Sequence, residues 1–285
     1  MSTTSRRRTS CGHCQCGTRA GRRSGSGFGG NPIFRKIAFT GETQTGCEIM
    51  AHAATHIKRV SLELGGLSPF IVCPATTRRS FSNRGQICIS VNRIYVAQEV
   101  AEPFTEEQVR RAERLKIGNV LETDVDLGPM FSRAQLERTR SHVADAIEKG
   151  AELLTSGREP EGEAYERGYF FRLTVLGEAD HSMRVMRKET FGPVVLIMKF
   201  KTQEEAVARA NDSEYGLAAY VFINDLKTAL RAAEGLVAGG IGVNVNNVVD
   251  LQAPFGGWKD SGLGQELGHW ELEAYLKTNH IRLGM

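Results

Sequence analysis

The order of apolar segments along the chain limits its fold more than any other feature. Short runs rich in β-branched residues alternate with longer segments whose apolar residues recur at helical spacing. The strand-like runs cover 35–40, 60–64, 69–72, 93–97, 169–176, 193–200, 218–223 and 240–245, and the helical segments cover 43–56, 103–115, 133–150, 203–211 and 227–237. This alternation predicts an α/β fold with a mostly parallel sheet flanked by helices. Residues 276–283 predict one more, exposed, strand.

The first 30 residues have a different composition. They are rich in Ser, Arg, Gly and Cys and carry almost no large apolar side chain, so burial cannot offset the entropy of ordering and we expect disorder. An organelle transit peptide, a basic nucleic-acid tail, a zinc cluster at Cys11, Cys14 and Cys16, and a leader without a role are the four interpretations. The transit peptide would lack an apolar face, and the cluster would lack a second pair of zinc ligands.

Charge and composition narrow the classes of function. The 285 residues are 41% hydrophobic and carry a formal charge of +3, but six arginines lie within residues 1–30, so the remainder has a net charge of −3. This remainder has no basic face with interleaved aromatic residues, the feature expected of a protein that binds nucleic acid, so we expect no nucleic-acid partner. No apolar run is long enough for a membrane helix, and no secretory signal follows Met1, so we expect a cytoplasmic protein without a membrane partner. The cysteines form no disulfide framework, which leaves free thiols available for chemistry.

Five glycine-containing motifs carry the candidate chemistry. "FTGETQTG" (39–46) is a strand, a glycine turn and a helix N-terminus, which suits a phosphate, although Glu42 would repel a pyrophosphate unless it points away. "LELGG" ends a strand on Glu63, either a general base or a solvated acid, and "KETFGPVV" sets Glu189 beside an aromatic residue. "RGQICIS" raises the question whether Cys88 is a buried small hydrophobe or a nucleophile. Residues 253–268 contain five glycines, which implies special backbone geometry or close packing.

In this order the motifs resemble the NAD(P)-dependent aldehyde dehydrogenase family from about Pro32 to Gly284, nearest to the succinate and glutarate semialdehyde dehydrogenases. The resemblance implies that family's parallel sheet flanked by helices, oxidation of a small aldehyde to a carboxylic acid, and NAD or NADP as cofactor. It implies Cys88 as nucleophile and Glu63 as general base, Gly41, Gly46, Leu64, Glu189 and Phe191 as cofactor-binding residues, Asn244 and Phe255 as substrate-binding residues, and Glu266 on a proton path. No metal is implied.

The chain also departs from the pattern of the family. Only 38 residues precede Phe39, and 30 of them are low-complexity, whereas one βαβ unit takes about 30 residues. We therefore expect an incomplete dinucleotide-binding domain in a truncated chain, without the family's catalytic asparagine. The expected partition is a leader (1–30), a cofactor-domain remnant (31–68), a catalytic domain (69–270) and a C-terminal oligomerisation strand (271–285).

Three local features also differ from the pattern of the family. Without covering strands, the runs "IAFT", "VSLEL" and "FIV" are expected to expose apolar surface and favour a homo- or hetero-oligomer with a family member. Glu63 and Cys88 are only 25 positions apart, and "CPATTRRS" replaces a crossover helix, so a right-handed crossover is expected to be difficult. The semialdehyde enzymes also place a substrate-binding arginine where this chain has Ser82, and Arg84 is two residues away.

Two other functions stay open on the sequence. One is a catalytically inactive fragment that acts, if at all, by docking on a full-length homologue. The other is a cofactor-independent thiol esterase that uses Cys88 and Glu63 alone.

Overall fold

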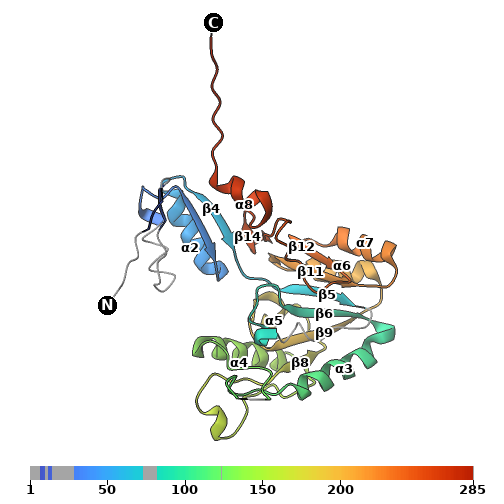
Figure 1. Ribbon diagram of the computed structural model, residues 1–285. Helices are drawn as coiled ribbons and strands as arrows, with labels where there is room; N and C mark the ends of the chain where they lie inside the picture. Colours follow the sequence, from blue (N-terminus) through green and yellow to red (C-terminus); the bar gives the residue numbers. More distant parts are fainter. Residues whose placement is uncertain (1–6, 10–11, 15–28, 73–81, 123, 285) are drawn as a thin grey trace.

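The computed structural model describes residues 7–9, 12–14, 29–72, 82–122 and 124–284. Its main body is a seven-stranded sheet in the order β12-β11-β5-β6-β9-β8-β7 (Figure 1). The strands are β5 (Ser68–Val72), β6 (Val91–Ala97), β7 (Glu152–Leu153), β8 (Thr174–Gly177), β9 (Val194–Phe200), β11 (Ala218–Phe222) and β12 (Gly240–Val243). Neighbouring strands run parallel except β7, which pairs antiparallel with β8.

Helices cover both faces of this sheet. They are α3 (Ala101–Arg114), α4 (Arg133–Glu148), α5 (Arg184–Arg187), α6 (Gln203–Asn211) and α7 (Leu226–Gly235). Because successive strand residues point to opposite faces, Ile71 and Leu196 enter one core with residues of α4, α6 and α7, whereas Phe70 and Val195 enter a second core with α3. Burial on both faces explains why the central strands read as continuous apolar runs.

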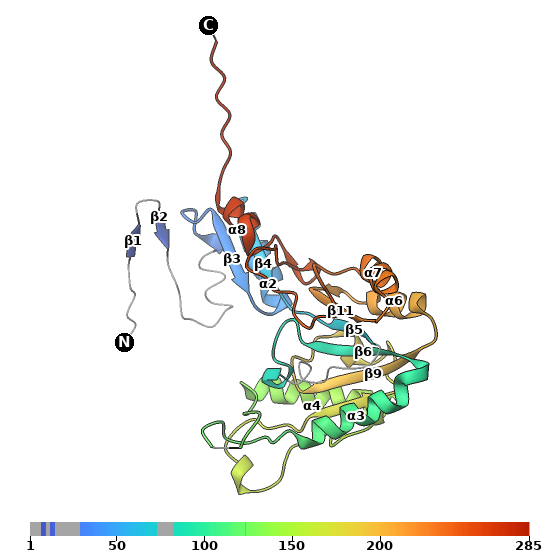
Figure 2. The ribbon, with the colours of Figure 1, turned by 45° about the vertical axis from the view of Figure 1, so that its right-hand side comes forward.

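A second, three-stranded sheet lies beside the main body, in the order β14-β4-β3 (Figure 2). Its strands are β3 (Lys36–Thr40), β4 (Arg59–Glu63) and β14 (Gly262–Leu263). Helix α2 (Thr43–Ala54) connects the parallel strands β3 and β4, and its residue Ile49 shares a small core with Leu62 and Leu64. Strand β14 pairs antiparallel with β4, so a segment from the far end of the chain completes this sheet.

Short elements connect these units. A two-stranded pair, β10 (Tyr215–Gly216) and β13 (Trp258–Lys259), precedes helix α8 (Gly268–Tyr275), and the 3-10 helices are η1 (Ser82–Gly85), η2 (Gln98–Val100) and η3 (Glu163–Tyr165). Near the N-terminus β1 (Arg7–Thr9) pairs antiparallel with β2 (Gly12–Cys14). That pairing differs from the disorder expected there, because backbone hydrogen bonds need no apolar side chains. No helix among the described residues is long and apolar enough to cross a bilayer.

The predicted α/β class and the order of its main elements are confirmed. The run 169–176 is a strand only from Thr174, because its first residues join the loops through an isolated bridge between Met130 and Tyr169. Helix α8 was not predicted, since its glycine-rich approach gave no helical periodicity.

One expectation was wrong, and a second held only in part. Residues 276–284 form no strand, because an extended segment needs a pairing partner and this one leads away from the body (Figure 1). "FIV" is at most 2% exposed and residues 61–64 are buried, so they do not present the expected apolar surface, whereas Ile37, Phe39 and Val60 stay partly exposed. Strands β5 and β6 pair in parallel, but residues 73–81, on which the expected difficulty of the crossover rests, lie outside the described part of the chain.

The cross-strand pair Leu153 and Leu176 tests this burial pattern. Leu176 on β8 is fully buried, whereas its partner Leu153 on β7 is 41% exposed. We expect Leu176→Ala to lower the free energy of unfolding by about 2 to 5 kcal/mol, because it leaves a cavity in the core. Leu153→Ala, the matched control, should change it by about 0.5 kcal/mol or less. Urea denaturation of both variants checks this, and equal losses would contradict the assigned burial.

Candidate functional site

Glu63 is a carboxyl group buried at the end of a strand. It is the last residue of β4, where it pairs with Thr40 of β3 on one side and Gly262 of β14 on the other. The residue is 4% exposed, and among the described residues neither of its side-chain oxygens has a hydrogen-bond partner. Burial, and then the nearby charge of Glu266, raise the pKa of Glu63 to about 8. Glu63 can therefore accept a proton at near-neutral pH, as a general base must.

Cys88 lies in the loop between η1 and β6 and is half-buried. Gly66, just after β4, packs directly against this loop: a Cβ atom there would lie 2.3 Å from the carbonyl oxygen of Cys88. The "LELGG" turn and the cysteine loop are thus in contact, and the short spacing between Glu63 and Cys88 does not keep the two motifs apart. Only glycine permits this approach without displacing backbone.

The surroundings of Cys88 favour the protonated thiol. Burial raises the pKa of Cys88, and the carboxyl groups of Glu189 and Glu63 raise it further. Backbone N–H groups of Ile89 and of Cys88 itself donate to the sulfur and oppose that rise. The balance of these effects keeps the pKa of Cys88 above its ordinary value. Sequence reasoning had no signal for the N–H of Ile89 beside the sulfur.

Glu189 approaches the same turn from the other side. Its Oε1 accepts a hydrogen bond of 2.9 Å from the N–H of Gly66. Burial raises the pKa of Glu189 to about 7, against the opposing effect of the Gly66 hydrogen bond. Two residues on, Phe191 has a positive φ of 51°, and its carbonyl accepts from the side chain of Gln135 at 2.9 Å.

A cleft of about 470 Å³ opens next to Glu189. The first residues of α2 line it, and no side chain caps the N-terminus of that helix. Arg138 donates to Glu42 across the cleft at 2.6 Å, so the carboxylate that would repel a phosphate is paired with a cation. The residues lining the cleft are Glu42, Thr43, Gln44, Cys47, Arg138, His142, Lys188, Glu189, Glu214, Tyr215 and Asp260.

These residues fit part of a nicotinamide dinucleotide. Free N–H groups at a helix N-terminus suit a phosphate, and a half-buried carboxylate suits ribose hydroxyl groups. Gly41 donates its N–H to the carbonyl of Glu63 at 3.0 Å, and a Cβ at Gly46 would meet the Leu64 side chain at 2.5 Å. The predicted cofactor-binding glycines thus set the turn and pack α2 on β4.

Comparisons with known proteins agree with this geometry. The family model described as "Aldehyde dehydrogenase family" matches residues 12–281. The chain belongs to the aldehyde dehydrogenase family.

The relatives span a longer chain. An NADP(+)-dependent succinate-semialdehyde dehydrogenase of Escherichia coli is 38% identical over 90% of this chain and 54% of its own length. A glutarate-semialdehyde dehydrogenase of Pseudomonas aeruginosa is 38% identical over 89% of this chain and 54% of its own. The crystal structure of betaine aldehyde dehydrogenase from Staphylococcus aureus in complex with NAD+ superimposes with a TM-score of 0.86 at 35% identity, over 90% of this chain and 53% of its own. The chain thus spans about half the length of the relatives it matches.

The remaining family-matched residues occupy two places. Phe255 forms an antiparallel bridge with Glu266, and that bridge holds Glu266 close enough to influence the carboxyl of Glu63. Asn244 lies at the end of β12, and its side chain both donates to the carbonyl and accepts from the N–H of Ile223. Its amide is therefore committed to a neighbouring strand rather than to Cys88.

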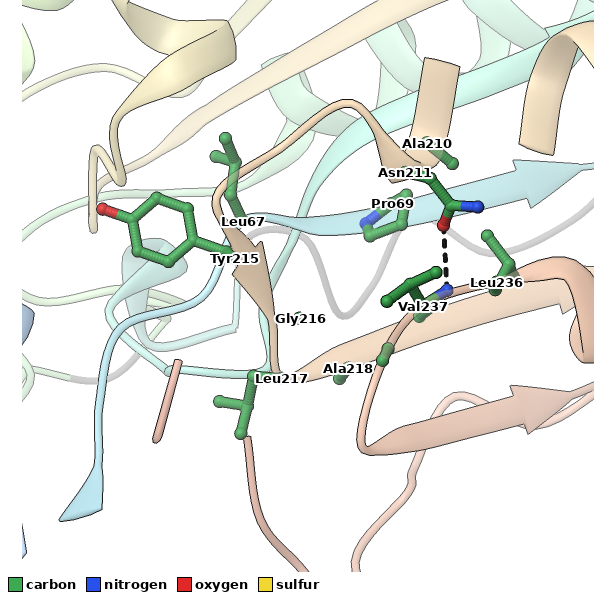
Figure 3. A pocket seen from close by; sticks show the side chains of 12 residues that line it. Leu67, Pro69, Ala210, Asn211, Tyr215, Gly216, Leu217, Ala218, Leu236 and Val237 are labelled. Atoms are coloured by element: carbon green, nitrogen blue, oxygen red, sulfur yellow. Dashed lines mark hydrogen bonds between the residues drawn. The ribbon is translucent and has the colours of Figure 1, made fainter. Parts of the chain in front are cut away.

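The other candidate sites offer less evidence of ligand binding. A cavity lined by β5, the end of α6 and β11 holds only about 10 Å³, room for about one water molecule (Figure 3). The hydrogen bond of 2.8 Å from Val237 to Asn211 helps to close it. No cluster of potential metal ligands occurs among the described residues, and Cys11 and Cys16 of the possible zinc cluster lie outside them.

The buried carboxyl of Glu63 makes a prediction about stability. Because its pKa is raised to about 8 in the folded chain, the folded state keeps a proton that the unfolded chain releases near pH 4.5. The stability should therefore fall as the pH rises from about 4.5 to 8, by at most about 5 kcal/mol. Glu63→Gln, which cannot ionise, should match the wild type at pH 4.5 and exceed it at pH 8.5.

Urea unfolding at the two pH values measures this difference. The exposed residue Glu148 provides the control, Glu148→Gln, which should show the wild-type pH dependence. If Glu63→Gln also keeps the wild-type dependence, its carboxyl does not hold the raised pKa.

Proposed function

We propose that this chain oxidises an aldehyde to a carboxylic acid with NAD+ or NADP+ as the hydride acceptor. The observation that carries the proposal is the packing of the "LELGG" turn against the Cys88 loop, which brings the carboxyl groups of Glu63 and Glu189 within electrostatic range of one thiol. Membership of the aldehyde dehydrogenase family supports it.

In the first half of the reaction Cys88 is the nucleophile. Glu63 as carboxylate accepts the thiol proton, and the thiolate forms a bond to the aldehyde carbon. The aldehyde oxygen becomes an oxyanion that the N–H groups of Cys88 and Ile89 can stabilise. A bound nicotinamide supplies the hydride acceptor that turns this thiohemiacetal into a thioester.

In the second half Glu63 activates water. Glu63 must first release to solvent the proton that it took from the thiol. The water oxygen then attacks the thioester carbon while Glu63 takes a proton, and the carbon–sulfur bond breaks to release the acid and the Cys88 thiolate. Glu266 lies within electrostatic range of Glu63 and is half-exposed, so it is the group proposed to pass that proton toward solvent. Phe255 is proposed to line the aldehyde site from its bridge with Glu266. Asn244 is proposed as a second contact for the aldehyde and would first have to exchange its hydrogen bonds with Ile223.

The proposed substrate is a small aliphatic aldehyde or semialdehyde. The named relatives include dehydrogenases of succinate and glutarate semialdehydes. Arg84 is not the group that would bind a substrate carboxylate, because its guanidinium donates inward to the carbonyls of Gly128 and Phe171.

The cofactor is proposed to contact the unit β3-α2-β4 beside the cleft. A doubly wound dinucleotide domain uses two mononucleotide-binding halves, and this unit belongs to one of them. The C-terminal segment 271–285 stays a proposed oligomerisation segment, and a second copy or a longer family member is its proposed partner.

Reduction of NAD+ and NADP+ by the purified chain over a panel of aldehydes and semialdehydes tests the proposal. We expect turnover that rises with pH up to about 8, because Glu63 must be ionised to act. Cys88→Ser should lower turnover by at least about 10³-fold, and Glu63→Gln by about 10²- to 10⁴-fold. Both variants should keep the wild-type fold by circular dichroism.

Other outcomes select the alternatives. The chain's thiol and base could also hydrolyse an activated ester, so ester hydrolysis without cofactor and without aldehyde oxidation would favour the thiol esterase. Absence of both activities, with retention of a longer family member, would favour the inactive docking fragment.

A further inference from the structure

Arg84 is a buried cation without an anionic partner. Its side chain is 1% exposed, and no carboxylate of the described residues forms an ion pair with it. Its Nη1 donates to the carbonyl of Gly128 at 2.6 Å, and its Nη2 donates to the carbonyl of Phe171. Burial lowers the pKa of Arg84 to about 10. Burying a guanidinium without an ion pair costs desolvation free energy, so we look for a role of Arg84 other than stabilising the fold.

The two carbonyls belong to segments distant in sequence from the cysteine. Gly128 precedes α4, and Phe171 precedes β8. A second contact reinforces the first: the N–H of Phe131 donates to Gln86 Oε1 at 3.0 Å. Both side chains flanking Gly85 therefore attach the turn before Cys88 to one external segment, residues 128–131.

The turn itself is held in an uncommon conformation. Asn83 and Arg84 both have positive φ values, 47° and 59°, although neither is glycine. Inside the turn, Asn83 Nδ2 donates to the carbonyl of Gln86 at 2.9 Å. Left-handed backbone at consecutive non-glycine residues persists only where the surroundings hold it, and the Arg84 contacts supply that restraint.

The helix that follows this segment also holds the loop that carries Glu189. Two residues after Phe131, helix α4 begins, and its buried residue Gln135 donates to the carbonyls of Thr190 and Phe191. About two helical turns further along α4, His142 Nδ1 lies 3.0 Å from Thr190 Oγ1. Residues 128–142 therefore contact both the loop that carries Cys88 and the loop that carries Glu189.

We infer that Arg84 is a positioning residue: it anchors the Cys88 loop to residues 128–142, which also hold the Glu189 loop, and so fixes the Cys88 thiol relative to that loop. An arginine suits this role because its planar fork of donors can reach two carbonyls at once, whereas a lysine ammonium is a single point. The inference deepens the proposed function, but its first test is thiol chemistry that needs neither cofactor nor turnover.

The experiment measures the rate of alkylation of Cys88 by iodoacetamide as a function of pH, with each cysteine followed separately by peptide mass spectrometry. Arg84→Met keeps a long apolar side chain and removes both hydrogen bonds. Freed from the anchor, the thiol should move toward solvent and away from the carboxyl groups, so its pKa should fall. The Cys88 rate should rise about three- to tenfold below the wild-type midpoint, which should itself shift to lower pH. The exposed Cys47 gives the internal reference rate.

Two further variants separate positioning from general loosening. Arg84→Lys retains the charge and one donor direction, so its Cys88 rate should lie between those of the wild type and Arg84→Met. Thr155→Val removes a buried hydroxyl that donates to the carbonyl of Leu173 and accepts from the N–H of Val175, neither of which belongs to the cysteine loop. It should destabilise the chain without changing the Cys88 midpoint. If Arg84→Met does not fold, Arg84→Lys against Thr155→Val decides.

An unchanged Cys88 midpoint in folded Arg84→Met or Arg84→Lys would overturn the inference. An equal rate increase in Thr155→Val at equal loss of stability would also overturn it. If the wild type oxidises aldehydes, Arg84→Met should in addition lower kcat by at least about tenfold while the thiol becomes more reactive toward iodoacetamide, since misplacement costs turnover but not exposure. If no chain oxidises an aldehyde but the midpoint shifts, the proposed function fails and the positioning role of Arg84 stands.

Discussion

The burial of one unpaired carboxyl group, that of Glu63, is the constraint on which the rest of the site depends. The carboxyl is enclosed because β4 is the central strand of the small sheet, with β3 on one side and β14 on the other. Within the described part of the chain, no hydrogen bond to this carboxyl group compensates for the water that it has lost. Desolvation favours the neutral acid, and the neighbouring Glu266 adds to that preference. Burial of this carboxyl group thus lowers the stability of the fold and leaves a group that titrates in the neutral range.

Closing the site requires chain segments that are far apart in sequence. The hydroxyl of Ser261 donates to the carbonyl of Gly65 at 2.7 Å across 196 positions, and Leu64 donates its N–H to the carbonyl of Ser261 at 2.9 Å. These bonds hold the turn after β4 against the glycine-rich segment near the C-terminus. The five glycines of 253–268 are understandable on this basis, since a Cβ at Gly262 would lie 2.3 Å from the carbonyl oxygen of Leu62.

Sequence patterns predicted the parts whose signals are local. The alternating apolar runs predicted the α/β class, because burial on both faces of a parallel sheet is written into each strand. The motifs around Cys88 and Glu63 predicted the groups proposed to react. The inward direction of the Arg84 side chain could not be predicted. Its acceptors are two backbone carbonyls more than 40 positions away, and because every residue has a carbonyl, the sequence does not show which ones accept a hydrogen bond. The missing strand at 276–284 has the opposite cause: its pattern is local, but a strand also needs a partner.

The acids around Cys88 should titrate as a group rather than singly. Glu189 and Glu63 each raise the pKa of the thiol, so ionising either carboxyl makes the thiolate harder to form. Conversely, a thiolate would hold protons on both carboxyls. With Glu189 near pH 7 and Glu63 near pH 8, the protons leave in macroscopic steps that belong to the cluster. A base and a nucleophile that oppose each other's ionisation keep the thiol protonated and unreactive until a proton can leave for solvent. The half-exposed Glu266, whose charge acts on Glu63, is the group proposed to carry that proton toward solvent.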